Sequence, residues 1–232
     1  MALAGLVLFV MTQARVAHPM VPRGLFRSRA VPGAMAVGFA FVVGYYGVPF
    51  VMSLYLQSVR SLSPLAAGAA FVPMMATGAT LTPLSPRLAA RLGARALTAG
   101  GLVLMAAGLV SLAVVVAAPG SAVVPVWAVA ALMIPVGLAG PLVTPPVTMA
   151  LLDSVPAGQA GTASGVFNTS RQVGGALAVA VFGALLAHRA TFLAGLRVSL
   201  LLAAGVALAA AVAGLVLLRH REACRLTDLV QE

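Results

Sequence analysis

Six long apolar stretches joined by short connectors constrain this chain more than any other feature of its sequence. Each is long enough for the roughly 20 residues that a helix needs to cross a bilayer. They lie near residues 31–56, 65–85, 97–118, 124–149, 166–187 and 197–218. None alternates polar and apolar residues as a membrane β-strand would. The sequence therefore predicts an all-α, polytopic membrane protein built as a six-transmembrane-helix bundle.

The composition indicates that lipid, rather than water, surrounds most of the chain. Of 232 residues, 62% are hydrophobic and 8% are charged, whereas a soluble domain carries roughly a quarter charged residues. The net charge of +10 comes from 14 arginines, with no lysine, against four acids. These arginines stand in short runs between apolar stretches, which is a topology signal. We expect contact with the lipid bilayer and no binding of nucleic acid.

The arginines also predict the orientation of the bundle. If the first full span runs outward, ten arginines are cytoplasmic and three are outside, a clear positive-inside bias. The cytoplasmic set is Arg15, Arg23, Arg27, Arg29, Arg87, Arg91, Arg95, Arg219, Arg221 and Arg225. The outer set is Arg60, Arg189 and Arg197, and Arg171 lies inside or near a span. We expect a multi-pass protein of the cell membrane, with both ends of the six-span unit in the cytoplasm.

The predicted orientation also indicates what the segments outside the six spans are. An apolar segment that ends on the cytoplasmic side must come from outside, so residues 1–13 are expected to be the truncated remnant of a preceding membrane helix. The alternatives are an apolar arm in the membrane interface or a wrongly assigned start codon. Residues 14–30 would form a cytoplasmic linker and residues 219–232 a cytoplasmic tail.

The sequence contains no pattern typical of an enzyme or of a cofactor site. No G-x-S-x-G, Walker A or H-E-x-x-H motif occurs. His18, His188 and His220 are too scattered for a metal site, and Cys224 is alone. The acids Asp153, Glu222, Asp228 and Glu232 all lie in a loop or in the tail. We therefore expect no enzyme, no cofactor and no metal site, and within these spans no buried carboxylate that could carry a proton.

The stretch from Ala157 to Gly183 is the most informative part of the chain. Small residues let helix backbones approach closely in a membrane, and the candidates for this role are Gly161, Gly165, Gly174 and Gly175. Asn168, Arg171 and Gln172 bring polar groups to the start of an apolar run, which makes them candidates for a substrate cavity or a gate. Alternatively, Arg171 lies within about a turn of the interface and reaches the headgroups as an anchor.

Two further groups are candidate functional residues. Arg87, Arg91 and Arg95 are spaced by four, so on one helix they would share a face. With Gly93 they are candidates for a cytoplasmic gating loop, and the alternative is plain topology with contacts to lipid phosphate. Tyr45 and Tyr46 lie near mid-membrane, where a hydroxyl needs a partner or a wet cavity, so they are candidates for lining the substrate cavity. The alternative is that a neighbouring helix satisfies their hydroxyls.

In order along the chain, several short motifs resemble the 14-spanner drug:proton antiporter branch of the major facilitator superfamily. These are His18-Pro-Met-Val-Pro22, Leu25-Phe-Arg27, Tyr55-Leu-Gln57, Ser63-Pro-Leu-Ala-Ala-Gly68, Phe71-Val-Pro73, Arg91-Leu-Gly-Ala-Arg95 and Ala163-Ser-Gly-Val-Phe-Asn-Thr-Ser-Arg-Gln-Val-Gly-Gly175. The resemblance implies the C-terminal six-helix half of a transporter that exports hydrophobic or cationic small molecules by alternating access. It also implies that the coupling acids belong to an N-terminal half that is absent here, and that the Arg91–Arg95 loop is a C-half copy of a gating loop.

Three functional hypotheses remain at this stage. The first is half of a proton-coupled efflux transporter, with a separately encoded N-terminal half as a possible partner. The second is a truncated membrane protein or scaffold that transports nothing. The third, a homodimer of six-helix units, is weakened by the lack of an acid inside the spans.

Overall fold

The computed structural model describes residue 11 and residues 30–116 and 124–217. Nearly all of the expected helix remnant at 1–13 and of the linker at 14–30, and the whole tail at 219–232, therefore lie outside the described residues. The same holds for the arginines, acids, histidines and cysteine that these segments contain.

The described residues form helices and contain no strand, which confirms the predicted all-α fold. Six helical segments are long and apolar enough to cross a membrane, and one lies at each predicted position. They are α2 (Ala30–Ser58), a broken helix (Pro64–Leu92), α6 (Ala94–Val116), α7 (Val126–Leu152), α8 (Ala160–Leu186) preceded by the short turn η4 (Ala157–Gln159), and α9 (Phe192–Leu217).

The second span consists of four pieces because prolines begin each of them. The pieces are α3 (Pro64–Ala69), α4 (Val72–Leu81), η2 (Thr82–Leu84) and α5 (Ser85–Leu92), and each has a proline in its first two positions. Proline fits the first turn of a helix, where a missing N–H costs nothing. The helical path therefore continues past residue 85, where the sequence analysis ended the span, and stops at Leu92.

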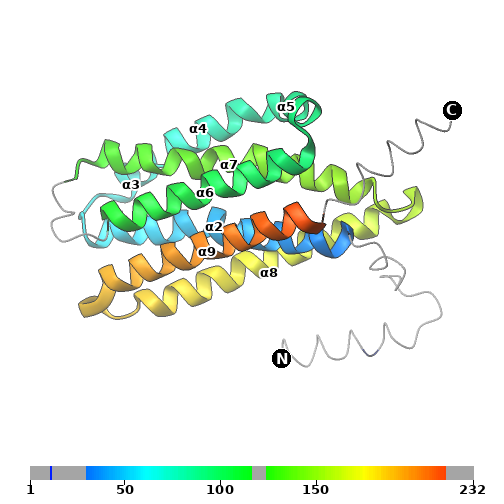
Figure 1. Ribbon diagram of the computed structural model, residues 1–232. Coiled ribbons are helices and arrows are strands. Elements are labelled where there is room, and N and C mark those ends of the chain that lie inside the picture. The colour runs from blue at the N-terminus through cyan, green and yellow to red at the C-terminus, as the bar shows by residue number, and fades with distance from the viewer. Residues whose placement is uncertain (1–10, 12–29, 117–123, 218–232) are drawn as a thin grey trace.

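The helices form two layers, with α2 at the centre. In one layer α2 lies between α7 and α8, and α4 packs on the outer side of α7. In the other layer α6 and α9 lie side by side and cover α7 and α2 (Figure 1). We call the end of the bundle at the α5–α6 link the Gly93 end, and the end at the α2–α3 link the Arg60 end.

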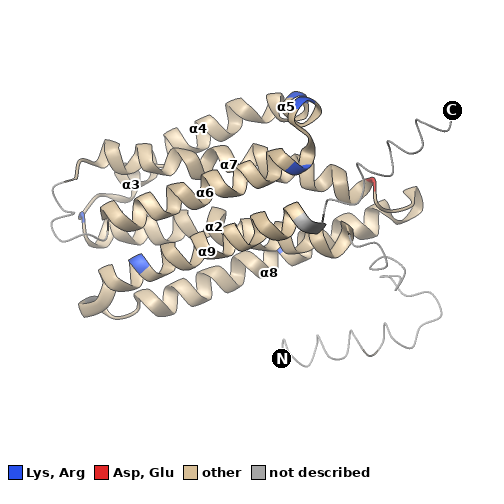
Figure 2. Cartoon of the chain, viewed as in Figure 1, with Lys and Arg blue, Asp and Glu red and all other residues tan. Residues whose placement is uncertain are grey.

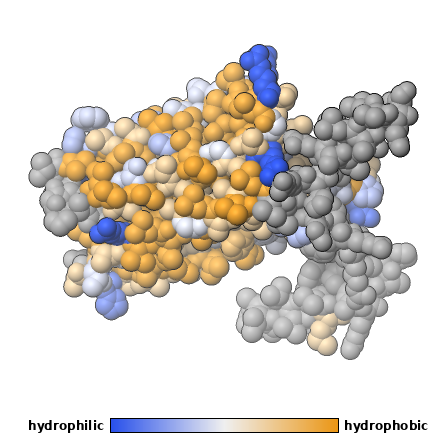
Figure 3. Space-filling view, viewed as in Figure 1, coloured by the Kyte–Doolittle hydropathy of each residue, from blue (hydrophilic) through white to orange (hydrophobic). Residues whose placement is uncertain are grey.

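Most charged residues lie toward the two ends of the bundle, and Arg171 on α8 is the exception among the described residues (Figure 2). The face formed by α6 and α9 is mainly hydrophobic (Figure 3). At the Arg60 end, the Arg60 guanidinium donates a hydrogen bond of 2.6 Å to the Val124 carbonyl, which ties the α2–α3 link to the start of α7. This distribution is what a helix bundle surrounded by lipid requires.

Aromatic side chains of α2 and α8 rest on glycines of the opposite helix. The pairs are Phe39 with Gly174, Tyr46 with Gly175, Phe167 with Gly38, and Phe182 with Gly47. At each glycine, an added Cβ would lie within about 3 Å of the aromatic residue opposite, and on Gly38 and Gly47 it would overlap the ring. Each helix therefore contributes both aromatic residues and glycines to this contact, which we call the α2–α8 interlock.

The six spans differ widely in how much of their surface the bundle buries. In the most apolar stretch of α2, 61% of the residues are buried. The corresponding share is 28% for the span that contains α8 and 22% for Pro64–Leu92. The second and fifth spans therefore present most of their surface to whatever surrounds the bundle.

We expect Gly174→Ala to destabilise the bundle. A methyl group there would press on the Phe39 carbonyl oxygen, 2.9 Å away, and force α2 and α8 apart. Overpacking of this kind typically costs about 1–3 kcal/mol. The measurement is the apparent melting temperature of the purified chain in detergent, followed by circular dichroism.

Gly165→Ala is the matched control, because it makes the same change in the same helix with nothing within 4 Å of the added carbon. It should leave the melting temperature unchanged or raise it slightly, since alanine favours helix more than glycine does. Equal melting temperatures for the two variants would contradict the interlock.

Candidate functional site

Three uncharged polar side chains gather on one flank of the α2–α8 pair. Tyr46 is 44% exposed, and its ring lies against Gly175. Asn168 is seven residues before Gly175 and therefore occupies the same face of α8 two turns earlier. Asn168 and Gln172 are both exposed. We call Tyr46, Asn168 and Gln172 the polar flank.

The polar flank is out of place on a surface that faces only lipid. Amide and hydroxyl groups lose their hydrogen bonds with water when they enter hydrocarbon, and they have to find partners there. Gly161 and Gly165 lie beside the flank, and nothing in the bundle comes within 4 Å of a Cβ on either of them. The flank and these glycines together form a narrow, uncharged strip that suits a polar cavity or another helix.

The four glycines expected to pack helices therefore divide into two pairs. Gly174 and Gly175 are buried in the α2–α8 interlock. At Gly161 and Gly165 no described atom lies within 4 Å of an added Cβ, so close packing of a helix on that side of α8 requires a surface from outside the described bundle.

Arg171 lies deeper in its helix than the sequence analysis placed it. Because α8 begins at Ala160, Arg171 is about 16 Å along the axis from the start of the helix. Its side chain turns toward α2, where its Cγ would lie 3.4 Å from a Cβ on Gly38. Its guanidinium carbon is 5.7 Å from the centre of the Phe167 ring, within cation–π range. Its Nε is buried without a hydrogen-bond partner.

Tyr45 and Tyr46 face different surroundings although they are adjacent in the sequence. Tyr45 is half-buried where α2, α4 and α7 meet, and its hydroxyl oxygen would lie 3.1 Å from a Cβ on Gly140. Its ring is also 4.9 Å, centre to centre, from the ring of Phe41. Tyr45 therefore fills a helix junction, whereas Tyr46 belongs to the exposed polar flank.

Ser85 is a positioning residue that the sequence analysis missed. Its hydroxyl is buried and donates a hydrogen bond of 2.5 Å to the Pro141 carbonyl on α7. That carbonyl would normally accept from the N–H four residues later, but residue 145 is a proline and has none. Ser85 therefore supplies the missing donor and joins the start of α5 to the proline-rich part of α7. A proline inside a span, which leaves a carbonyl free, was the signal for such a donor.

The arginines of the expected gating loop belong to two helices. Arg87 and Arg91 are exposed on α5, which ends at Leu92. Gly93 follows with φ 82°, a conformation that favours glycine, and Arg95 lies in the first turn of α6. The spacing by four therefore does not put all three arginines on one helical face. Arg95 differs from the other two because its Nε is buried without a hydrogen-bond partner.

Among the residues that the structure describes, no three histidine, cysteine or acidic side chains come together as metal ligands. The one acid within these ranges, Asp153, lies just beyond the end of α7. The geometry therefore offers binding surfaces made of uncharged polar groups and arginines.

Comparison with known proteins gives one consistent result. A family model described as Major Facilitator Superfamily matches residues 2–179. The methylenomycin A resistance protein of Streptomyces coelicolor is 29% identical over 185 residues, which cover 80% of this chain and 38% of that protein. The multidrug resistance protein Stp of Mycobacterium tuberculosis is 32% identical over 189 residues, with 80% and 34% covered. The tetracenomycin C resistance and export protein of Streptomyces glaucescens is 29% identical over 181 residues, with 78% and 33% covered. The chain spans about a third of the length of these relatives.

The bond between Ser85 and Pro141 can be tested with a double-mutant cycle. Ser85→Ala should lower the stability of the bundle by about 1–3 kcal/mol, because it leaves a buried carbonyl without a donor. In a Pro145→Ala background the backbone N–H of residue 145 can take that carbonyl, so the same substitution should cost little. The measurement is again the apparent melting temperature in detergent.

Ser111→Ala serves as the control, because the Ser111 hydroxyl donates to a carbonyl of its own helix at an exposed position. An equal loss of stability from Ser85→Ala in both backgrounds would show that Ser85 does not act through this carbonyl.

Proposed function

The chain belongs to the Major Facilitator Superfamily, and from this premise we propose that it forms one six-helix bundle of a two-bundle efflux transporter. In this proposal a second bundle packs against the polar flank, and the cavity between the bundles takes up hydrophobic or cationic small molecules. The observation that carries the proposal is the exposed polar flank on a span of which the bundle buries little. The relatives named for drug resistance and export support it.

The polar flank suits a broad range of apolar or positively charged substrates. It holds no charge, so entry of a cation meets no fixed positive group on this strip, and the face of the Tyr46 ring can attract one. The amides of Asn168 and Gln172 can each donate and accept hydrogen bonds. Arg171 turns away toward α2 and reaches the cavity only if its contact with Phe167 changes. We place it as a candidate for gating and not for direct binding of a cation.

In this proposal alternating access comes from movement of the proline-rich helix α7 relative to the tightly packed pair α2 and α8. The α2–α8 interlock holds two spans together as a unit. On the other side, α7 contains four prolines, and α4 packs mainly on α7. Rocking of α7 would carry the second span with it through the Ser85 bond.

We propose that the Gly93 end faces the cytoplasm and that proton coupling uses carboxylates of the second bundle. The start of α2 and the end of α9 lie at this end, and the sequence has seven arginines before α2 and after α9 in addition to Arg87, Arg91 and Arg95. The described spans contain no acid, since Asp153 lies beyond the end of α7. A separately encoded N-terminal bundle could supply such an acid.

Transport assays with and without a second bundle test this proposal. We expect the chain alone in proteoliposomes to give no proton-driven ethidium efflux. Efflux that a protonophore abolishes should appear when cells also produce a membrane protein encoded by the reading frame immediately upstream. Efflux by the chain alone would overturn the assignment of coupling to the second bundle. An upstream frame that encodes no membrane spans would favour the alternative of a scaffold that transports nothing.

In cells that produce both this chain and the upstream-encoded protein, Gln172→Leu should slow ethidium transport by about 2- to 10-fold at limiting substrate. This factor corresponds to the loss of one hydrogen bond to the substrate. Val173→Leu is the matched control, because Val173 is also exposed on α8 but is apolar and turned away from the flank. Equal transport by the two variants would argue against a polar flank that faces the cavity.

A further inference from the structure

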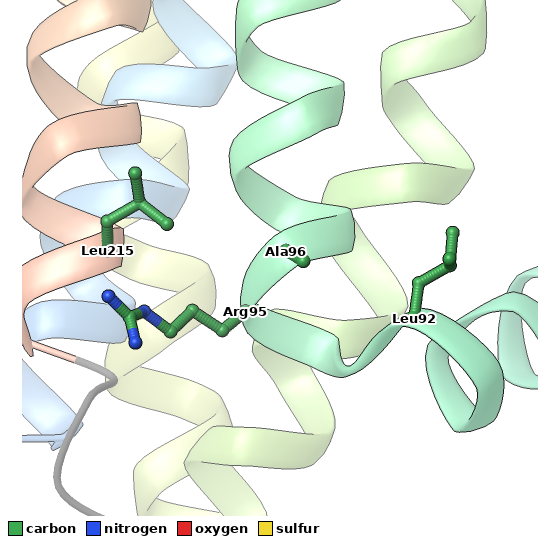
Figure 4. A pocket seen from close by; sticks show the side chains of 4 residues that line it. All are labelled: Leu92, Arg95, Ala96 and Leu215. Atoms are coloured by element: carbon green, nitrogen blue, oxygen red, sulfur yellow. The ribbon is translucent and has the colours of Figure 1, made fainter.

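A pocket at the Gly93 end is lined by α5, α6 and α9, none of which contributes a residue to the polar flank. It has a volume of about 310 Å³ and is lined by Leu92, Arg95, Ala96 and Leu215. Figure 4 shows the Arg95 side chain extending from the first turn of α6 toward Leu215 on α9. The pocket is therefore apolar, with one positive charge in it.

Among the described residues, the Nε of Arg95 is the unsatisfied polar group at this pocket. This nitrogen is buried and has no hydrogen-bond partner within the described ranges, and burying a donor without an acceptor is unfavourable. The only acid among the described residues, Asp153, lies at the end of a different helix. The start of α6 carries a partial positive charge and the end of α9 a partial negative charge, and the two helix ends meet beside the pocket. These partial charges oppose each other, so the full charge of Arg95 makes the electrostatic potential in the pocket positive. An anion is the ligand that this pocket lacks.

An apolar seam leads from the pocket toward the middle of the bundle. Ala96, Val103 and Val110 recur at intervals of seven residues on α6 and are all exposed. Leu201, Leu208 and Leu215 do the same on α9, which lies antiparallel beside α6. Residues seven apart lie on one face of a helix, so each row follows one exposed, apolar face of its helix. Each row is about 21 Å long, more than half of a hydrocarbon core of about 30 Å.

We propose that this pocket and seam bind an anionic phospholipid. Arg95 donates to the phosphodiester at the level of the headgroups, and one acyl chain lies along the seam between α6 and α9. The guanidinium provides donors in the planar geometry that phosphate oxygens accept. A zwitterionic headgroup gains less, because no described acid lies at the pocket to receive its ammonium group. The site is separate from the polar flank and does not depend on transport.

Arg87 and Arg91 do not form a comparable site. Both are exposed on α5, and neither lines this pocket. Their charges raise the local concentration of anionic lipid, an effect that salt screens. Arg95 is distinguished by burial of its Nε and by the seam that begins beside it, and this difference makes the proposal testable.

The test measures lipid retained by the full purified chain in a neutral detergent, using native mass spectrometry. The chain is titrated with phosphatidylglycerol and, separately, with phosphatidylcholine. We expect clear preference for phosphatidylglycerol. Arg95→Gln should weaken its binding about tenfold or more, the range for hydrogen bonds to a charged group. Arg91→Gln, which removes the same charge from an exposed position, should change it less than about twofold. Equal losses in the two variants would overturn the proposal in favour of general surface charge.

A second variant tests the pocket without changing charge. Ala96→Phe fills it from the exposed side and should abolish the preference for phosphatidylglycerol while the chain keeps its helical circular dichroism spectrum. Full retention of lipid by this variant would overturn the site. Excess inorganic phosphate should not displace the lipid, because the phosphate ion gains nothing from the seam. Complete displacement would show that the pocket takes a free phosphate ion and not a lipid.

Discussion

Close approach of helix backbones at glycines is the constraint on which this bundle depends. Lipid tails are as apolar as leucine side chains, so the hydrophobic effect does not drive helices together inside a membrane. Packing has to supply the attraction instead, and dispersion forces fall off steeply with distance. The α2–α8 interlock meets this requirement by placing aromatic rings where the opposite helix has no side chain. Because α2 also contacts α6, α7 and α9, its position fixes the rest of the bundle.

The interlock also determines where the functional surface lies. Burial of Gly174 and Gly175 turns Asn168 and Gln172 outward and keeps the Arg171 side chain against α2. The same helix therefore has one face committed to the bundle and another available to a second bundle or a substrate. Prolines have a parallel role in α7, since Pro145 leaves a carbonyl that only a donor from another helix can satisfy, and Ser85 provides it.

Much of the fold could be predicted from the sequence, whereas the candidate site could be predicted only in part. Length and hydropathy located all six spans, because the thickness of the hydrocarbon core sets how long a spanning helix must be and its apolar nature sets which residues the helix can contain. The spacing by four did not correctly predict a shared helical face for arginines 87, 91 and 95, because Gly93 interrupts the helix between the second and the third. The start of the fifth helix was placed six residues too late, because α8 begins at Ala160, among small and polar residues that hydropathy does not count as part of a span. Gly161 and Gly174 look alike in the sequence, but only the second has a helix opposite it.

The sequence by itself determined that this protein is a set of six membrane helices with most of its charges at or beyond the helix ends. Those properties follow from the cost of placing polar groups in hydrocarbon, which acts on each residue separately. Only the tertiary structure decided which glycines pack, which of two adjacent tyrosines stays exposed, and which arginine lines a pocket with its Nε buried. Those outcomes depend on which helices are neighbours and at what rotation, and no local property of the chain encodes either of them.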